Sequence, residues 1–508
     1  MRVSVQSRAA VAGIVAAIAG LGVAELVAAL VATTSSPLFV VGALAIDLAP
    51  GWLKELVISI ARTADKPVLL VTIAVVAAAL SALAGVVELR RPPLGRLLIA
   101  LLAVPAVLAA VTRADAGALA SAPSIAGAVT AVLVLPWLVG RLRPVRDTVP
   151  ADRLARRSFL IAAGITAGAG VLTLALGRVL AAGPEVAAKA RAMFRLPKPT
   201  VPAAAIPAAA RLDVAGISPL ITPNASFYRI DTALQVPRIE ASAWKLKITG
   251  MVEHPVTLSF DELVALPLEE SRTTLACVSN YVGGDLIGTA TWLGYPIRKL
   301  LERARPHPDA DMVLSTSVDG FTAGTPLSVL TDTRNAILAV GMNGEPLPFE
   351  HGYPVRMVVP GLFGYVSATK WVTQLKVTTF DKDRAYWTNQ GWSERGPVKL
   401  SSRIDVPRAG TTVKPGTVAV AGVAWRQHVG VVRVQVRVDD GDWHDAELAA
   451  PLSADTWRQW VWRWDATPGG HTLTVRATDA TGEVQTSRVT DVVPDGATGL
   501  HSVDVTVA

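Results

Sequence analysis

Five apolar runs in the first 182 residues constrain this chain more than any other feature of its sequence. They cover about residues 9–32, 67–87, 94–112, 116–140 and 158–182. Each run is long enough, or nearly long enough, to cross a bilayer as an α-helix. A weaker stretch at 36–60 is interrupted by charged residues and a proline, and we expect it to lie at the membrane interface. The sequence therefore predicts a membrane region, residues 1–182, with about five transmembrane helices.

Arginines gather beside these runs and predict their orientation. Arg2 and Arg8 precede the first run, and Arg90, Arg91 and Arg96 lie between the second and the third. The connection at 141–157 carries Arg141, Arg143, Arg146, Arg153, Arg156 and Arg157. Positive charge favours the cytoplasmic side, and five crossings put all three groups there. We therefore expect a multi-pass protein of the cell membrane whose C-terminal region lies on the extracytoplasmic side.

The last run is preceded by a second, independent signal. Arg156 and Arg157 stand directly before Ser158, Phe159 and Leu160, and a run of small apolar residues follows. This pattern resembles a twin-arginine export signal embedded in the chain, a signal that serves proteins folded around a cofactor before export. The alternative is an ordinary membrane anchor with positive charge on its cytoplasmic side.

Two polar features of the membrane region bear on its role. All seven histidines lie after residue 182, so the predicted helices offer no imidazole to a b-type haem. Glu25 is the one acidic residue well inside a predicted span. It could mark a proton or ion path, but a pair with a neighbouring helix is the expected use.

The chain after residue 182 divides into three segments by composition. Residues 183–223 are rich in proline, which favours an extended linker over a helix. Residues 224–400 mix short β-rich runs with short helical ones, which indicates an α+β domain. Residues 401–508 show period-2 strands separated by turns, which predicts an all-β immunoglobulin-like sandwich. Alternation places Trp460, Trp462 and Trp464 on one strand face, where we expect core or interface rather than a ligand platform.

Cys277, in the stretch "TLACVSNYVGGDLIG", is the only cysteine of the chain. It has no partner for an intramolecular disulfide, so three uses remain: a buried inert thiol, a reactive thiol or a ligand. A lone cysteine is most often a small buried apolar residue. The motifs around it change that expectation.

These motifs resemble the sulfite oxidase family of molybdopterin-dependent oxidoreductases, which includes the catalytic subunits of methionine-sulfoxide reductases. The resemblance is carried by "NASFYRID" from residue 224, by "TLACVSN", by "GGDLIGTATWLGYPIRKLL" and by "AVGMNGEPLPFEHGYPVRMVVPGLFGYVSATKW" at 339–371. It continues into the tryptophan-rich sandwich, which is similar to the family's dimerisation domain. It implies that Cys277 is the catalytic thiolate and the protein ligand of molybdenum.

The resemblance also implies a set of residues that bind the pterin and its phosphate. These are Asn224, Phe227, Tyr228, Arg229, Ser317, His351, Arg356, Ser367, Thr369 and Lys370. Arg356 and Lys370 suit a phosphate chemically, because one is a planar fork of donors and the other a point charge. For Arg356 by itself, a surface salt bridge would be the ordinary use.

The sequence departs from the family where a substrate would bind. Sulfite oxidases commonly continue the cysteine motif into paired arginines, whereas Asn280 is here followed by Tyr281 and Val282. Where those enzymes have an active-site tyrosine, this chain has Phe321 in "VDGFTAG". The methionine-sulfoxide reductase subunits usually lack an asparagine at the position of Asn280. The motif therefore leaves the substrate open.

Together with the predicted membrane region, the resemblance implies a membrane-anchored molybdenum-molybdopterin enzyme. It would transfer an oxygen atom and two electrons to or from a small sulfur- or nitrogen-containing substrate. Since the chain has no haem-attachment C-x-x-C-H and no iron–sulfur cysteine set, we expect no haem or iron–sulfur cluster in it and a separate electron carrier, a protein or a quinone-linked partner. The similarity to a dimerisation domain allows a homodimer through the C-terminal domain.

Three other functions fit the sequence less well than this one. Nucleic-acid binding is not expected, because the arginines behind the net charge of +7 cluster beside membrane runs. A membrane transporter with an accessory outer domain is disfavoured by the nearly charge-free helices. An exported binding or scaffold protein with a vestigial site is disfavoured because Cys277, Arg356 and Lys370 are all present.

Overall fold

The computed structural model describes residues 5–31, 34–50, 53, 56–57, 65–113, 116–142, 151–181 and 185–508. Arg2, Arg143 and Arg146 lie outside these residues, as does the side chain of Arg153. The chain forms two compact units. The helical unit comprises Met1–Val186 and Thr232–Val236, and the C-terminal unit comprises Ala187–Asp231 and Pro237–Ala508.

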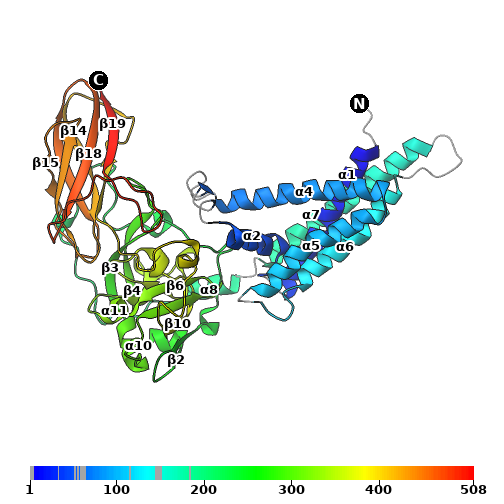
Figure 1. The fold of residues 1–508 in the computed structure, drawn as a ribbon, viewed down its shortest axis with the longest axis horizontal. Helices are drawn as coiled ribbons and strands as arrows, with labels where there is room; N and C mark the ends of the chain where they lie inside the picture. The colour runs from blue at the N-terminus through cyan, green and yellow to red at the C-terminus, as the bar shows by residue number, and fades with distance from the viewer. Residues whose placement is uncertain are drawn as a thin grey trace. The chain divides into compact units, whose positions relative to one another are not determined.

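The helical unit is built from long apolar helices (Figure 1). Its described helices are α1 (Val5–Val31), α2 (Pro37–Leu48), α4 (Asp65–Arg90), α5 (Leu94–Thr112), α6 (Ala122–Gly140) and α7 (Ala151–Ala181). Among the described residues, five helical segments are long and apolar enough to cross a membrane: Val5–Val31, Lys66–Arg90, Leu94–Thr112, Ala122–Gly140 and Arg156–Leu180. The predicted α-helical region is thereby confirmed. The weak stretch at 36–60 yields the shorter apolar helix α2, and several of its later residues lie outside the description.

Small residues let α1 approach its neighbours α4, α6 and α7. A side-chain carbon at Gly13 would lie 1.8 Å from the Ser81 carbonyl oxygen of α4, and one at Gly85 would lie 1.9 Å from the Ala9 carbonyl oxygen of α1. Such close backbone contact is how helices associate where water provides no hydrophobic driving force.

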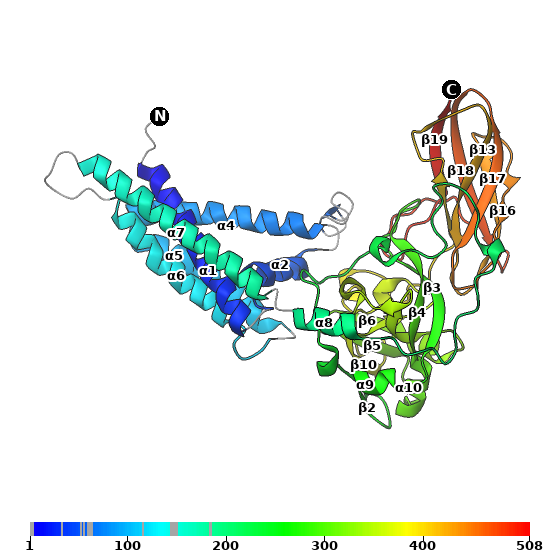
Figure 2. The ribbon, with the colours of Figure 1, turned by 180° about the vertical axis from the view of Figure 1, so that it is seen from behind.

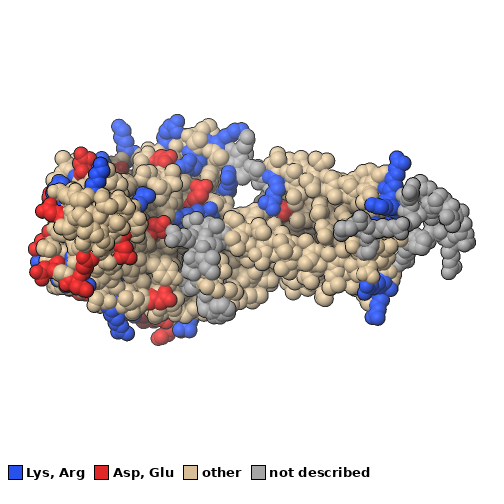
Figure 3. Space-filling view, turned by 90° about the horizontal axis from the view of Figure 1, so that it is seen from above, with Lys and Arg blue, Asp and Glu red and all other residues tan. Residues whose placement is uncertain are grey.

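The helical unit pairs the carboxylates that it buries. Glu25, 3% exposed, lies 3.2 Å from Arg178 Nε of α7 and accepts a hydrogen bond from the Ser36 hydroxyl. Glu88, 2% exposed, pairs with Arg96 at 3.0 Å. Glu25 therefore has the neighbouring-helix partner expected of it. On the face shown in Figure 3, charged side chains are sparse over the helical unit and of both signs over the C-terminal unit.

Five residues from far along the chain complete the helical unit. In the segment Thr232–Val236, the Ala233 carbonyl accepts a hydrogen bond from Lys66 Nζ at 2.7 Å. Leu234 of the same segment lies against Gly42 of α2, where a side-chain carbon would come within 2.8 Å of Leu234 Cδ1.

The proline-rich segment, expected to be an extended linker, combines a helix with extended chain. Helix α8 (Glu185–Met193) opens it, in a stretch that contains no proline. The chain beyond is extended and lies along the C-terminal unit: the Thr200 N–H donates to the Leu268 carbonyl at 2.7 Å, and Val201 bridges to Glu269. Leu220 is buried. Long-range contacts of this kind leave no local signal in the sequence.

The region predicted as an α+β domain combines short helices with two sheets. One has the order β2 (Val256–Ser259), β1 (Lys245–Gly250), β10 (Val372–Thr378), β5 (Met312–Ser317) and β6 (Thr322–Pro326). The other has the order β3 (Glu269–Ala276), β4 (Ile287–Pro296), β7 (Ile337–Met342) and β8 (Glu345–Pro346), with β9 (Arg356–Val358) also paired to β7. The same part of the chain contains the short helices α9 (Phe260–Val264), α10 (Ile297–Ala304) and α11 (Leu327–Thr331). A capping box between Ser259 and Glu262 starts α9.

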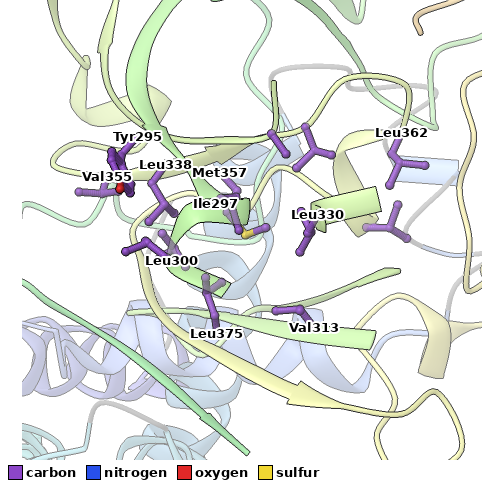
Figure 4. Packing of buried hydrophobic residues seen from close by; sticks show 14 of the residues in the cluster. Tyr295, Ile297, Leu300, Val313, Leu330, Leu338, Val355, Met357, Leu362 and Leu375 are labelled. Atoms are coloured by element: carbon purple, nitrogen blue, oxygen red, sulfur yellow. The ribbon is translucent and has the colours of Figure 1, made fainter. Parts of the chain in front are cut away.

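One continuous apolar core fills this region. Figure 4 shows Leu375 of β10 and Val313 of β5 across from Leu338 of β7, with Ile297 and Leu300 of α10 between them. Each of these five side chains is fully buried. The core fixes the two sheets relative to each other, and the sheets carry the loops described below.

The chain ends in a sandwich of two sheets (Figure 2), which confirms the predicted all-β fold. One sheet has the order β11 (Ser401–Val406), β13 (Gly416–Trp425), β17 (Arg458–Ala466) and β16 (Glu447–Leu448). The other has the order β12 (Thr412–Val413), β19 (His501–Val507), β18 (Gly469–Asp479), β14 (Val431–Val438) and β15 (His444–Asp445). Trp460 and Trp464 are buried in the sandwich core and Trp462 is partly buried against it, so the tryptophan face is core.

Candidate functional site

The only cysteine lies where strand β3 ends and a tight loop begins. Cys277 follows Ala276 and is 9% exposed. Its N–H donates to the Leu286 carbonyl at 2.9 Å, directly before β4 begins. The Asn280 side chain closes the same loop, because its Oδ1 accepts the Leu286 N–H at 2.9 Å. The thiol is therefore held at the mouth of the β3–β4 hairpin, and Asn280 has a structural use there.

The "FYR" motif brings an aromatic pair beside this loop. Phe227 is buried, stacks on Tyr228 at 5.3 Å between ring centroids, and meets the rings of Trp292 and His351 edge-on at 5.8 and 5.5 Å. Burial is the main cause that raises the pKa of Tyr228, and the nearby Cys277 adds to it, whereas Arg356 acts to lower this pKa. Tyr228 therefore stands near both the cysteine and the arginine, and it stays protonated.

Arg356 is a buried cation without a carboxylate in contact. It is 3% exposed, and its guanidinium donates to the carbonyls of His351 and Ala368 at 3.2 and 3.4 Å. The group also lies 5.0 Å from the centroid of the Trp292 ring. Burial lowers its pKa to about 10, which measures how poorly the site solvates this charge.

Two further cations share one acid next to it. Lys370 Nζ and Arg229 Nε each lie 2.9 Å from Asp231 Oδ2. Burial lowers the pKa of Lys370 to about 8, and Arg356 and Arg229 add to this effect while Asp231 opposes it. We call Arg229, Arg356 and Lys370 the cationic cluster. Its three positive charges face the one carboxylate of Asp231, which leaves two positive charges in excess.

Gly352 makes room for this cluster. Its φ of +107° lies in the left-handed region. A side-chain carbon there would come within 2.9 Å of Arg356 Cβ and 3.2 Å of Lys370 Cβ. The two cationic side chains can run side by side only because this position has no side chain.

Among the residues that the structure describes, two buried polar atoms at the site have no hydrogen-bond partner. They are His351 Nδ1 and the Ser317 hydroxyl. His351 Nε2 lies 3.3 Å from the Asn224 carbonyl, and burial together with Lys370 and Arg356 lowers the pKa of His351 to about 3, so the ring is neutral. Ser317 ends β5 and pairs with Val372, two residues after Lys370. Buried polar groups are nearly always satisfied, so these two atoms are available to hydrogen-bond a ligand.

Three other predicted residues already have partners inside the protein. The Asn224 amide donates to Glu345 Oε1 at 2.6 Å and accepts from Asn343 at 2.7 Å. The Ser367 hydroxyl donates to the Phe363 carbonyl at 2.9 Å, and the Thr369 and Ser315 hydroxyls lie 2.7 Å apart. In the structure these side chains position the surrounding loops.

Sequence reasoning missed Asp231, Trp292 and Gly352. Asp231 stands two residues after Arg229 in "FYRID", and an acid inside a cationic motif is a signal that could have been used. Trp292 and Gly352 carry no such signal, because their roles arise from side chains distant in the chain. Together the site residues have the charges and donors to bind a polyanion.

Comparisons with known proteins match the two parts of the C-terminal unit separately. Residues 233–387 match the family model of the oxidoreductase molybdopterin binding domain, and residues 401–475 match that of a bacterial Ig domain. Mitochondrial sulfite oxidase of Rattus norvegicus is 30% identical over 287 residues, which cover 47% of this chain and 52% of that protein. The chain thus spans about half the length of the curated sulfite oxidase it matches.

A second relative and a solved structure are also similar to this chain. The uncharacterized oxidoreductase YuiH of Bacillus subtilis (strain 168) is 33% identical over 158 residues, 31% of this chain and 76% of that protein. The crystal structure of the sulfane dehydrogenase SoxCD from Paracoccus pantotrophus shares the fold with a TM-score of 0.51 at 23% identity, over 57% of this chain and 82% of that chain.

Proposed function

This chain belongs to the sulfite oxidase family of molybdopterin-dependent oxidoreductases, and from that premise we propose that it is a membrane-anchored enzyme of oxygen-atom transfer. The substrate is a small molecule that contains sulfur or nitrogen. Oxidation would add one oxygen from water to the substrate and release two protons and two electrons; reduction would run in reverse. A separate carrier, a protein or a quinone-linked partner, takes up or supplies the electrons.

The site residues divide the work of holding the cofactor. When bound, the molybdenum-molybdopterin group supplies the two-electron redox chemistry. Cys277 is the protein ligand of the metal, because a thiolate is a preferred ligand for a soft site. Arg356 and Lys370 hold the anionic phosphate of the pterin. His351 Nδ1 and the Ser317 hydroxyl supply hydrogen bonds that the protein itself leaves unmade.

One observation carries the proposal: the cationic cluster has two excess charges, and its Arg356 acts on the same tyrosine, Tyr228, as Cys277 does. Burying a charge is costly unless an opposite charge or hydrogen bonds compensate. Asp231 compensates only one of the three cations. A vestigial site would not be expected to keep this cost, so a bound anion is the physical reason for it.

The loop after Cys277 bears on the substrate. Tyr281, 41% exposed, and Val282 follow Asn280 and bring no positive charge to the mouth of the hairpin. A small oxyanion such as sulfite would therefore find no cation on this loop. S-oxides, N-oxides and sulfite, each offered with an artificial electron carrier, test the substrate class directly.

The location of the catalytic region is a further part of the proposal. The predicted arginine asymmetry places the C-terminal region on the extracytoplasmic side. Arg156 and Arg157 lie within helix α7, and we propose that they act as a twin-arginine signal. A reporter fused at the C-terminus should be active only outside the cytoplasm. Unchanged export of the Arg156→Lys/Arg157→Lys variant would leave a plain membrane anchor.

Metal analysis of the full chain tests the enzyme itself. Protein purified in detergent from a cofactor-competent host should carry about one molybdenum per chain. Cys277→Ser should abolish turnover and alter the spectrum of the metal, whereas Ser279→Ala, a change in the same loop, should do neither. Wild-type protein without molybdenum would refute the enzyme and favour a binding or scaffold role.

A further inference from the structure

The loop that carries Cys277 is held partly by its own hydrogen bonds and partly by bonds from outside the loop. Hydrogen bonds join Cys277 to Leu286, Asn280 to Leu286, and the Gly284 N–H to the Tyr281 carbonyl at 2.8 Å. These bonds fix the base of the loop and its turn. The Gly284 carbonyl of this turn accepts its hydrogen bond from the C-terminal sandwich.

Arg403, on strand β11 of the sandwich, donates a hydrogen bond to this turn. Its Nη1 donates to the Gly284 carbonyl at 2.6 Å, its Nε donates to Asp405 at 2.7 Å, and its Nη2 donates to the Ser218 hydroxyl at 2.8 Å. Arg403 is 9% exposed. A guanidinium with three different partners is held in one orientation, so the loop carbonyl is held as well.

His501, at the start of strand β19, lies against Gly283, the residue before Gly284. The Gly283 φ of +77° requires glycine, and a side-chain carbon there would lie 2.2 Å from His501 Cδ2. The ring is oriented in turn, because its Nδ1 accepts the Ile404 N–H at 3.0 Å. Burial and the nearby Arg403 lower the pKa of His501, so its neutral form can accept this bond.

The strand on the other side of Cys277 is attached to the same sandwich. Three residues before the cysteine, the Thr274 N–H donates to the Asp455 carbonyl at 2.9 Å. The Thr274 hydroxyl accepts the Trp457 N–H at 2.8 Å, and its carbonyl accepts Gln427 Nε2 at 3.2 Å. Both flanks of Cys277 are therefore fastened to one domain.

We propose that the C-terminal sandwich is an integral part of the Cys277 site, with Arg403 and His501 as positioning residues that hold the loop and, through it, the thiolate. A metal ligand works only when its support holds it within a fraction of an ångström. This role lies within one chain and differs from pairing two chains. It rests on the proposed function for its meaning, but its geometry can be tested without the cofactor.

Because Cys277 is the only cysteine, its alkylation reports the loop alone. We expect iodoacetamide to label the cofactor-free full chain about tenfold faster in Arg403→Lys than in the wild type, since a lost charge-assisted hydrogen bond eases local opening. His501→Asn, which removes the ring from Gly283, should act in the same direction. Arg433→Lys is the matched control: it alters an exposed sandwich arginine of β14 that pairs with Asp445 of β15 at 2.6 Å.

The loaded chain supplies the second readout. Arg403→Lys should alter the spectrum of the thiolate-bound metal and lower kcat more than KM, while the control keeps both. Labelling of both variants within twofold of Arg433→Lys would overturn the proposal, even if the protein contains molybdenum. Faster labelling in a chain that binds no molybdenum would support the positioning role and refute the enzyme instead. If Arg403→Lys lowers the unfolding midpoint of the whole chain, His501→Asn alone decides.

Discussion

The helical unit and the candidate site of the C-terminal unit bury charge in opposite ways. Among the described residues of the helical unit, the buried carboxylates Glu25 and Glu88 each have their own arginine. In the C-terminal unit, the cationic cluster shares the single carboxylate of Asp231. A balanced pair needs nothing further to be stable, whereas an unbalanced cluster needs an anion. The cationic cluster is therefore where we expect an anionic ligand to bind.

Removing one cation from the cluster should have the largest effect. Arg356→Met keeps an unbranched apolar stem but loses the guanidinium and its charge. We expect the variant to retain its cofactor roughly thirtyfold less well, which corresponds to about 2 kcal/mol for one charge-assisted contact. Molybdenum and pterin content after prolonged gel filtration measures this, with Arg433→Met as the control.

The same variant should change stability in the opposite direction when the cofactor is absent. An uncompensated buried arginine costs the cofactor-free protein free energy. Cofactor-free Arg356→Met should therefore unfold at a higher temperature than the cofactor-free wild type. A lower midpoint, or full cofactor retention, would show that the cluster serves the fold and no ligand.

His351 should make the cofactor-free protein sensitive to acid. Its folded pKa of about 3 lies below the ordinary 6.5, so the unfolded chain takes up the proton first as pH falls. The stabilisation is complete above pH 6.5 and is lost toward pH 3, at up to about 1.4 kcal/mol per pH unit. The unfolding midpoint measured across this range should fall less steeply in His351→Gln. An identical pH profile in both proteins would contradict the neutral, buried ring.

Breaking the balanced pair in the helical unit should cost less. Glu25→Gln leaves Arg178 without its charge partner, but the Arg178 side chain is 43% exposed and water compensates in part. We expect a loss of about 1 kcal/mol in the free energy of unfolding in detergent micelles. Adding Arg178→Gln should recover part of it. A loss of export or turnover without a loss of stability would instead point to an ion path through Glu25.

An exposed pair should show the smallest effect. Arg433→Ala breaks the bond to Asp445, where both side chains are more than half exposed. We expect the free energy of unfolding to change by less than about 0.5 kcal/mol and the metal content to stay constant. A large change here would mean that charge removal harms this protein in general, and the comparison between the two units would lose its force.

Local patterns sufficed for much of the fold. The apolar runs predicted the long helices, and the short β-rich and helical runs of residues 224–400 predicted an α+β domain, in which β1 and β10 lie side by side. The capping box of Ser259 and Glu262 that starts α9 was not part of the prediction. Helix α8 was missed because the prolines that surround it dominate the composition of its segment.

The site was accessible to sequence reasoning only as separate motifs. Family resemblance pointed to Arg356 and Lys370, which remain predicted phosphate ligands, but the acid that joins Lys370 to Arg229 came from structure. Arg403 and Gly284 are 119 positions apart in the chain, and no periodicity or spacing connects them. Charge balance and loop support are properties of packed side chains, which a linear pattern does not contain.

Because the segment Thr232–Val236 belongs to the helical unit, the two units are not separated by a single point in the sequence. The chain passes from one unit to the other three times, after Val186, after Asp231 and after Val236. A gene fragment that starts at the α+β part would carry five residues that belong with the helices, and the first of them follows Asp231 directly. Transplanting the catalytic region onto another anchor therefore means redesigning this crossing as well as choosing a cut site in the proline-rich segment.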